Sequence, residues 1–480
     1  MRFVFSSSSF FLLTALFLVA GSAPVWAEAV PLAAPYLEGS DLNLIWVVPF
    51  VGMLLSIAVV PLMVPNFWHA HFGKISAFWA LAFLIPCAFV FGTQTAVYEL
   101  VHIALLDYIP FIILLLALYT VTGGVRLKGI VWSSPGVNTM FLSVGTLVAS
   151  FMGTTGAAML LIRPLIEANY WRRHNVHVIV FFIFLVANIG GSLTPLGDPP
   201  LFLGFLNGVD FFWPMVNLFL PMVLVAGIVL AMFFFLDSYF FRMEAESRLP
   251  REGEIHSLSI EGWVNLLLLV GVVLAVLLSG FWVPGITFMI NHVPIQLQNI
   301  ARDLLLLGLV FVSLMATEKK GRQANAFSWF PMMEVAKLFA GIFITIIPAI
   351  AILRAGSEGT LSAVVDLVSE NGEPVNAMYF WVTGILSSLL DNAPTYLVFF
   401  NTAGGDAETL MGPLSGTLVA ISCGAVFMGA MSYIGNAPNF MVRAIAEERG
   451  IAMPSFFGYM GWSLLFLVPV FMLVTLVFFS

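Results

Sequence analysis

Long apolar runs constrain this chain more than any other feature. From Leu42 to Phe479, apolar runs of about 20 residues, the length that an α-helix needs to cross a bilayer, follow one another with short polar links. Hydrophobic residues make up 60% of the chain and charged residues only 9%, against roughly 25% charged residues in soluble domains. These proportions exclude a soluble globular enzyme. The sequence predicts an all-α polytopic membrane protein embedded in a lipid bilayer.

Four polar breaks interrupt these apolar runs. Two of them are rich in Gly and Pro, at Asn188–Gly204 (NIGGSLTPLGDPPLFLG) and at Met431–Val442 (MSYIGNAPNFMV). A shorter polar break precedes each of these, at Met152–Ala158 (MGTTGAA) and at Leu389–Thr395 (LLDNAPT). Two breaks in each half of the chain, in the same order, are typical of a duplicated transporter whose broken helices form a binding site at the middle of the membrane.

The order of the predicted elements repeats between the two halves. An alignment of Thr154 with Asp391, and of Gly197 with Gly435, needs nearly the same offset, close to half the chain length. Each half is predicted to contain about five transmembrane helices, one re-entrant hairpin and one broken helix. The predicted spans, hairpins and broken helices are Leu42–Pro65, Ile75–Gly92, Tyr108–Gly123, Asn138–Ala168, His177–Gly208, Met215–Phe240, Gly262–Trp282, Asp303–Ala316, Val335–Leu353, Asn376–Asn401, Gly416–Ala446 and Phe457–Phe479.

Basic residues collect on one side of this predicted topology, provided that the two hairpins return to the side from which they enter. The basic side holds Lys74, Arg126, Lys128, Arg172, Arg173, Arg242, Arg248, Arg251, Lys319, Lys320, Arg322, Lys337, Arg443 and Arg449. The other side holds only Arg302 and Arg354, so the positive-inside rule places the basic side in the cytoplasm. Five full crossings in each half make repeat 2 (262–480) inverted relative to repeat 1 (28–241), with 242–261 as a cytoplasmic linker.

The N-terminal segment 1–27 is predicted to be an export signal. It has an apolar core at Phe10–Ala20 and a small-residue cleavage site at Val25–Ala27. An uncleaved first span is the alternative. Two short amphipathic segments, Ala96–Asp107 and Thr360–Ser369, are predicted to lie on the membrane surface.

The breaks are predicted to line a polar cavity, because lipid cannot satisfy the backbone amides and carbonyls that leave a helix inside the membrane. Proline lacks the amide donor and glycine weakens a helix, so these residues force the helix to open. The residues expected to produce the breaks are Gly191, Pro195, Gly197, Pro199, Pro200, Pro394, Gly435 and Pro438. A lone Gly-Pro break is often only a packing kink, but four breaks in matching places favour a site.

Two acids lie within the breaks, Asp198 and Asp391. An ionisable group at that depth costs at least about 2.5–3.5 kcal/mol, so it is expected to be functional. A carboxylate there can hold either sodium or a proton, and one group that holds either ion but not both is sufficient for exchange. Neutral oxygens suited to a hard cation are predicted from Asn188, Thr154, Thr155, Thr194, Asn392, Thr395, Ser432, Asn436 and Asn439. Helix capping is the alternative role for each of these residues.

The breaks resemble those of the ion transporter superfamily, which includes dicarboxylate and citrate carriers, arsenite permeases and NhaD-type sodium/proton antiporters. Within it, SLTPLGDPPLFLGFLNGVDFFW (Ser192–Trp213) and SSLLDNAPTYLVFFNTAGG (Ser387–Gly405) resemble a bacterial branch whose members are named citrate transporters or sodium:proton antiporters. The resemblance covers nearly the whole mature chain. It implies two inverted repeats, a homodimer, and ions or small carboxylates as cargo.

The motifs distinguish the two substrate classes only in part. Gly197-Asp198 matches the Gly-Asp motif of the NhaD type, and Asp391-Asn392 matches its polar hairpin motif in part. The carboxylate carriers use Ser-Asn-Thr at both hairpin tips, whereas this chain has Gly153-Thr154-Thr155 at one tip and an acid at the other. No Lys or Arg lies within any of the four breaks to pair with an anionic cargo.

The sequence therefore predicts a secondary transporter of the bacterial inner membrane. The preferred function is sodium/proton antiport, with Asp198 and Asp391 exchanging the ions. No cofactor is expected, and sodium is the transported or coupling ion. The alternative is sodium- or proton-coupled transport of citrate or a dicarboxylate. A channel is disfavoured because paired discontinuous helices suit alternating access. No basic patch for nucleic acid and no catalytic constellation for an enzyme is present in the sequence.

Overall fold

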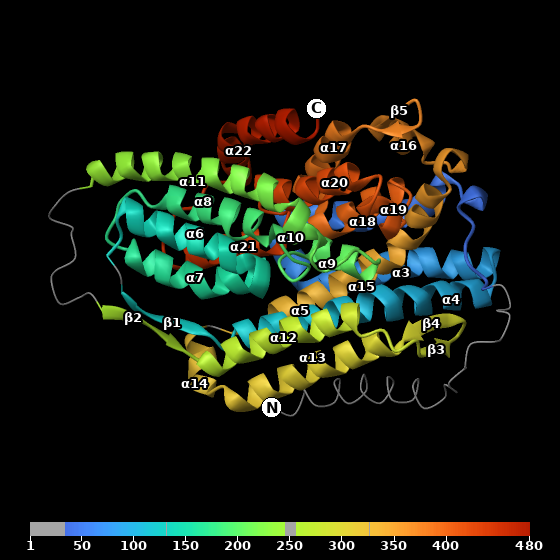
Figure 1. Cartoon of the computed structure of the whole chain (residues 1–480), viewed down its shortest axis with the longest axis horizontal. Helices are drawn as coiled ribbons and strands as arrows, with labels where there is room; N and C mark the ends of the chain where they lie inside the picture. The colour runs from blue at the N-terminus through green and yellow to red at the C-terminus, as the bar shows by residue number, and fades with distance from the viewer. Residues whose placement is uncertain (1–33, 131, 245–255, 326) are drawn as a thin grey trace.

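The computed structural model describes residues 34–130, 132–244, 256–325 and 327–480. These residues form a bundle of helices with three small two-stranded sheets (Figure 1). The predicted export signal, 1–27, lies outside the described residues, as does most of the predicted linker.

Nine of the described helical segments are long and apolar enough to cross a membrane. They are η2–α2 (Leu44–Met63), α3 (Pro65–Val90), α4–η3–α5 (Thr93–Thr122), α6 (Pro135–Met152), α11 (Phe219–Arg242), α12 (Trp263–Phe281), α13 (Leu297–Ala316), α15 (Phe330–Arg354) and α22 (Phe456–Phe478). Large apolar side chains on these segments stay exposed, for example Phe89 at 86% and Phe281 at 73%, which is the surface that lipid covers. The prediction of an all-α polytopic membrane protein is confirmed.

The remaining helices are short and most of them flank the breaks. They are η1 (Gly39–Asp41), α7 (Thr154–Ala168), α8 (Val176–Leu185), η4 (Ile189–Ser192), α9 (Pro199–Leu206), α10 (Trp213–Asn217), α14 (Lys319–Ala324), η6 (Gly356–Glu358), α16 (Ser362–Val368), α17 (Asn376–Leu390), α18 (Asn392–Thr402), α19 (Ala407–Met411), α20 (Ser415–Met428), η7 (Gly429–Met431) and α21 (Ala437–Glu448). Helices thus stop or restart inside each predicted break.

Two features of the first spans differ from the predictions. Ala96–Asp107 is not a separate surface helix, because α4 (Thr93–Ile103) continues through the π-helical turn η3 (Ala104–Tyr108) into α5 (Ile109–Thr122) as one 30-residue segment. The π-helical turn lets the helix absorb an extra residue without ending. In addition, α3 begins at Pro65 rather than near Ile75, so Lys74 lies within a helix and not in a loop.

The helices divide into two groups that pack against each other. The long-helix group comprises α2–α5, α12, α13 and α15, in which α3 packs on α15 and α5 packs on α12 and α13. The broken-helix group comprises α6–α9, α11, α17, α18 and α20–α22, in which α6 packs on α7 and α17 packs on α20. Figure 1 shows α5, α12 and α13 along the lower side of the molecule, and α6, α8, α11 and α20 above them.

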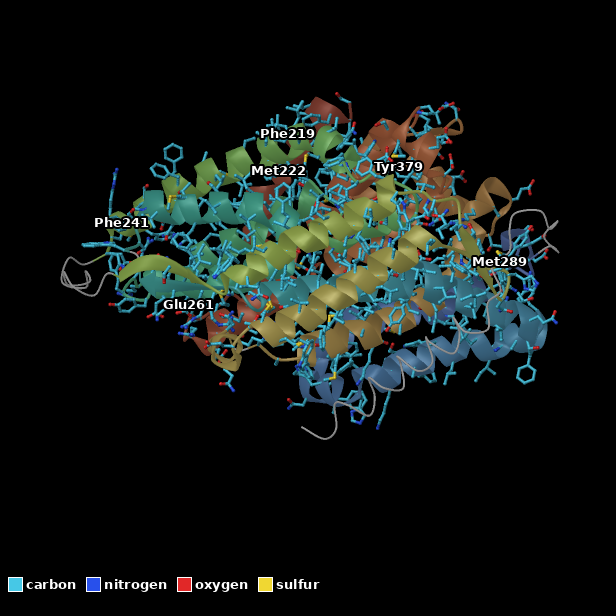
Figure 2. All side chains as sticks on the ribbon, turned by 60° about the horizontal axis from the view of Figure 1, so that its bottom comes forward. Phe219, Met222, Phe241, Glu261, Met289 and Tyr379 are labelled. Carbon is cyan, nitrogen blue, oxygen red and sulfur yellow. The ribbon has the colours of Figure 1, made fainter. Side chains whose placement is uncertain are left out.

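The small sheets mark the two ends of the bundle. β1 (Arg126–Ile130) pairs antiparallel with β2 (His256–Glu261) beside α14, and we call this the basic end, because Arg126, Lys128 and Arg322 lie there. At the opposite end, β3 (Thr287–Ile290) pairs with β4 (Val293–Gln296), and β5 (Ser369–Glu370) pairs with β6 (Glu373–Pro374) next to α16. Figure 2 shows Glu261 and Phe241 near one end and Met289 near the other.

The linker 242–261 ends in regular secondary structure at the basic end of the bundle. Its last six residues form β2, and Glu261 pairs with Arg126 at 3.4 Å and with Lys128 at 3.3 Å. The alternating polar and apolar residues of HSLSIE suit a strand, but a strand forms only where a partner is available. Which segment supplies that partner depends on the tertiary structure, and here it is β1.

Candidate functional site

Each of the two predicted hairpins turns at a single residue in an unusual backbone conformation. Gly153, with φ of 80°, separates α6 from α7, and Asp391, with φ of 111°, separates α17 from α18. Positive φ is open to glycine but strained for a residue with a side chain, and such strain is concentrated at functional sites. The second hairpin thus holds an acid where the first has glycine.

Each broken helix restarts just after a polar residue and has proline at its first or second position. α9 begins directly after Asp198 and α21 directly after Asn436, and both of these residues have an extended backbone. The opened backbone packs tightly: a Cβ on Gly197 would lie 2.2 Å from the Gly191 carbonyl oxygen. Glycine is therefore required at position 197, where the unwound backbone contacts the backbone of Gly191.

Asp198 lies at the point where all four breaks meet. Its side chain is buried, with 2% exposed, and its carboxylate accepts hydrogen bonds from three other breaks. Oδ1 accepts from Thr154 Oγ1 at 3.0 Å and from Asn436 Nδ2 at 2.9 Å. Oδ2 accepts from Asn392 Nδ2 at 2.5 Å. The predicted meeting of the four breaks at one place is therefore what the structure contains.

A chain of buried amides continues from Asp198 into the second broken helix. Asn436 Nδ2 also approaches Asn188 Oδ1 at 3.3 Å, and Asn188 Nδ2 donates to Asn439 Oδ1 at 2.7 Å. Asn439 Nδ2 in turn donates to the carbonyl oxygens of Gly429 and Ser432, both at 2.8 Å. Asn188 and Asn439 thus support the site, and they saturate the freed backbone of the second break.

Positions in the two halves correspond with a separation of 238 residues, the separation of Asp198 and Asn436. The same separation relates Gly153 to Asp391 and Thr154 to Asn392, which occupy equivalent places at the hairpin tips. The alignment of Thr154 with Asp391 was therefore wrong by one residue. The two hairpin tips are too short and too different in sequence to fix the register without the backbone.

Asp391 lies close to Asp198 but does not share its hydrogen bonds. The hydrogen bonds to its carboxylate come from backbone amides at the start of α18, such as that of Ala393 at 3.4 Å, and its side chain is partly exposed. None of the ion pairs in the described part of the chain involves Asp198 or Asp391. Two acids without a basic partner thus lie at the same level of the bundle.

Four other predicted residues do not contact the Asp198 carboxylate. Thr194 Oγ1 donates to the Ser150 carbonyl, and Ser432 Oγ donates to the equivalent Ser388 carbonyl at 2.5 Å, so each ties a broken helix to its hairpin. Thr395 Oγ1 donates to the Asp391 carbonyl one turn earlier in its own helix, at 2.7 Å. Thr155 instead lines a cavity beside the site. The first three stabilise the breaks in the way that capping residues do.

One polar atom in the site lacks a partner. Asn392 is fully buried, yet its Oδ1 has no hydrogen-bond partner among the described residues. A Cβ built on Gly429 would lie 3.0 Å from Asn188 Oδ1, 3.3 Å from the Gly435 carbonyl oxygen and 3.6 Å from Asn392 Nδ2. The absence of a side chain at Gly429 therefore leaves room beside two neutral oxygen atoms and the Asn392 amide group. Neutral oxygens of this kind suit a cation of the size of sodium.

A cavity of about 110 Å³ reaches this site from one direction. Asp198, Thr154 and Thr155 are among its few polar residues, and its other walls are apolar. Tyr119, near the end of α5, and Met332, in the first turn of α15, lie in these walls. Because α5 leads to β1 and α15 follows α14, this cavity lies on the side of Asp198 that faces the basic end.

Sequence reasoning missed a second buried polar cluster. Asp237, predicted only to lie at the end of a span, is fully buried and accepts from His177 Nε2 at 2.8 Å and from Asn138 Nδ2 at 2.9 Å. Arg172 Nη2 lies 2.5 Å from the same carboxylate, and Arg172 also donates to Asn169. These residues come from three separate stretches of the chain, at Asn138, at 169–177 and at Asp237, which is why no local motif reveals them. They join α6, α7, α8 and α11 at the base of the first hairpin.

A sequence model of a protein family described as "Putative citrate transport" matches residues 39–479. The chain belongs to this family. No curated protein matches it. Together with the nine apolar spans among the described residues, family membership identifies a multi-pass membrane transporter.

Proposed function

We propose that this transporter exchanges sodium for protons by alternating access, with Asp198 as the carboxylate that holds either ion. One observation carries this proposal. The buried carboxylate of Asp198 accepts three hydrogen bonds, all from neutral side chains of the other three breaks, and it forms no ion pair with the described residues. A carboxylate held in this way keeps its negative charge available for a small cation or a proton. Because one group cannot hold both ions, binding of one releases the other.

Sodium as the cargo ion is supported by the oxygens around Gly429. Asn188 Oδ1 and the Gly435 carbonyl oxygen lie near Gly429, and the buried Asn392, whose Nδ2 donates to Asp198, has an Oδ1 without a partner among the described residues. Hard monovalent and divalent cations prefer such oxygen ligands. Asp391, the second acid at this level, is proposed to take part in the exchange by attracting the cation to the site.

The proposed architecture is two inverted repeats, 28–241 and 262–480, in a bacterial inner membrane with the basic end in the cytoplasm. The constant separation of 238 residues between matching break positions supports the duplication. The basic residues at the β1–β2 end support the orientation, since positive loops remain in the cytoplasm. A homodimer follows from the resemblance alone and is part of the same proposal.

Coupled transport of citrate is the second candidate, and the description of the family favours it. Two observations weigh against it in this chain. No Lys or Arg forms an ion pair or hydrogen bond with the described residues of the four breaks that surround Asp198. The cavity beside Asp198 is also small, at about 110 Å³, and mostly apolar. A tricarboxylate bound there would need its charges compensated by helix ends or bound cations.

Reconstituted transporter in proteoliposomes separates the two candidates. Sodium, lithium and labelled citrate are supplied in turn, with internal pH as the readout. Proton movement driven by a sodium gradient in the absence of citrate is the expected result. The second candidate would replace the proposal if citrate accumulates only with a sodium or proton gradient and if no protons move when citrate is absent.

Replacing Gly429 by Ala is expected to weaken sodium binding. The backbone at Gly429 suits alanine, with φ of −53°, but the added methyl would lie 3.0 Å from Asn188 Oδ1 and fill the space between the oxygens. One extra methyl in a packed site costs about 1–3 kcal/mol, so the KM for sodium should rise about tenfold or more.

The matched control for this variant is Gly227→Ala in α11. No atom lies within 4 Å of a Cβ built there, so this variant should retain the wild-type KM. An unchanged KM in Gly429→Ala, in protein that is folded, would place the cation elsewhere.

A further inference from the structure

A second and larger cavity lies on the other side of the four breaks. Its volume is about 550 Å³, and its walls come from α4, α15 and the segment around η1. Its floor is formed by Asn207, just after α9, and by Leu397 and Asn401, in the middle and near the end of α18. It shares no lining residue with the cavity that reaches Asp198 from the basic end.

The two cavities are separated by two half-helices that start at the site. α9 follows Asp198 and has eight residues, which is about 12 Å of helix. α18 starts at Asn392 and has eleven residues, about 16 Å. A path that enters through the larger cavity would therefore run along these two half-helices to reach Asp198.

Two polar contacts close the floor of the larger cavity. Arg354 Nε, at the end of α15, donates to Asn401 Oδ1 at 2.7 Å. Asn207 Nδ2, just after α9, donates to Asp107 Oδ1 in η3 at 3.5 Å. Each contact joins the end of a half-helix in the broken-helix group to a span of the long-helix group. Movement of one group against the other would break both contacts without disturbing the bonds of Asp198.

The charge of the larger cavity suits a cation. It is lined by four carboxylates and one guanidinium, from Glu38, Glu99, Asp107, Glu358 and Arg354. A cavity with an excess of negative charge and low-dielectric walls raises the local concentration of cations and repels anions.

We propose that this cavity is the outer half of the transport path, and that the Arg354–Asn401 and Asp107–Asn207 contacts keep its floor closed while Asp198 faces the basic end. The assignment of a cation as the cargo in this cavity rests on the proposed sodium/proton exchange. The assignment of the cavity to the path does not, because it follows from the position of the cavity relative to α9 and α18.

Cysteine accessibility tests the path directly. Ala351→Cys places a thiol in the cavity wall, and the two native cysteines, Cys87 and Cys423, are fully buried, so the wild-type transporter is the control. A membrane-impermeant cationic methanethiosulfonate, added from outside to right-side-out vesicles, should modify Ala351→Cys and block transport, while wild type keeps its activity. Modification that leaves the transport rate unchanged, or the absence of modification from outside, would overturn the assignment of the cavity to the path.

A comparison of two reagents tests the charge of the cavity. At Ala351→Cys, the modification rate of the cationic methanethiosulfonate is divided by that of the anionic one, and the same ratio is measured for a small free thiol. The ratio at Ala351→Cys should be larger by at least about fivefold, because the cavity carries excess negative charge. Adding Asp107→Asn should lower that ratio and raise the external KM for sodium. A faster reaction with the anionic reagent would overturn the cation assignment. If the cationic reagent blocks transport in a protein that carries citrate and not sodium, the assignment of the cavity to the path stands and the proposed sodium/proton exchange is refuted.

Discussion

Replacing Asp198 by Asn should reduce sodium/proton exchange by at least ~100-fold while the protein remains folded. Asparagine has nearly the volume of aspartate and can still accept from Thr154 and Asn436, which bond to Oδ1 at 3.0 and 2.9 Å. The change removes only the group that can carry a proton or balance a cation. The measurement uses everted membrane vesicles that are acidified inside and then receive sodium. Wild-type vesicles should release protons on sodium addition, and Asp198→Asn vesicles should not.

Three companion variants make this experiment decisive. Asp198→Glu should retain part of the activity, since the carboxylate is kept but is displaced from its three donors. Asp391→Asn should impair exchange less than Asp198→Asn, because Asp391 shares none of those donors. Asp210→Asn changes an exposed acid and should leave exchange at the wild-type rate. Full activity in a transporter that lacks both Asp198 and Asp391 would refute the scheme.

Replacing Asp237 by Ala should destabilise the transporter by about 3–5 kcal/mol, the cost of removing one partner of a buried ion pair. Asp237 and Arg172 side chains are both 0% exposed, so the variant leaves the Arg172 guanidinium charged, buried and uncompensated. His177 and Asn138 lose their acceptor at the same time. Thermal unfolding in detergent, followed by size-exclusion chromatography, measures the effect.

Two further variants test the cause of that loss. Glu261→Gln removes an ion-pair partner whose side chain is 43% exposed, so it should cost at most about 1 kcal/mol. Combining Asp237→Ala with Arg172→Met should cost less than the sum of the two single changes, because no charge is then left unpaired. If Asp237→Ala unfolds at the wild-type temperature, the cluster does not hold the base of the first hairpin together.

The spans, the hairpins and the place of each break could be predicted from the sequence because they depend on local physics. A run of apolar residues long enough to cross a bilayer becomes a helix wherever it lies, and Gly or Pro opens that helix next to its own position. The boundaries of α12, α17, α20 and α22 therefore fall within a few residues of the predicted ones. Predictions failed where context decides, as at Ala96–Asp107, whose polar residues face the larger cavity rather than the membrane surface.

The roles of the individual polar residues depend on contacts between distant segments, and only the tertiary structure decided them. The sequence by itself determined that the four breaks, the two unpaired acids Asp198 and Asp391, and a duplicated order of helices would occur in a membrane protein. Only the fold showed that Asp198 takes donors from three other breaks and Asp391 none, and that Asp237 closes a buried cluster with Arg172. Helices and breaks form from neighbouring residues, whereas a hydrogen bond between residues 238 positions apart exists only after the chain has packed.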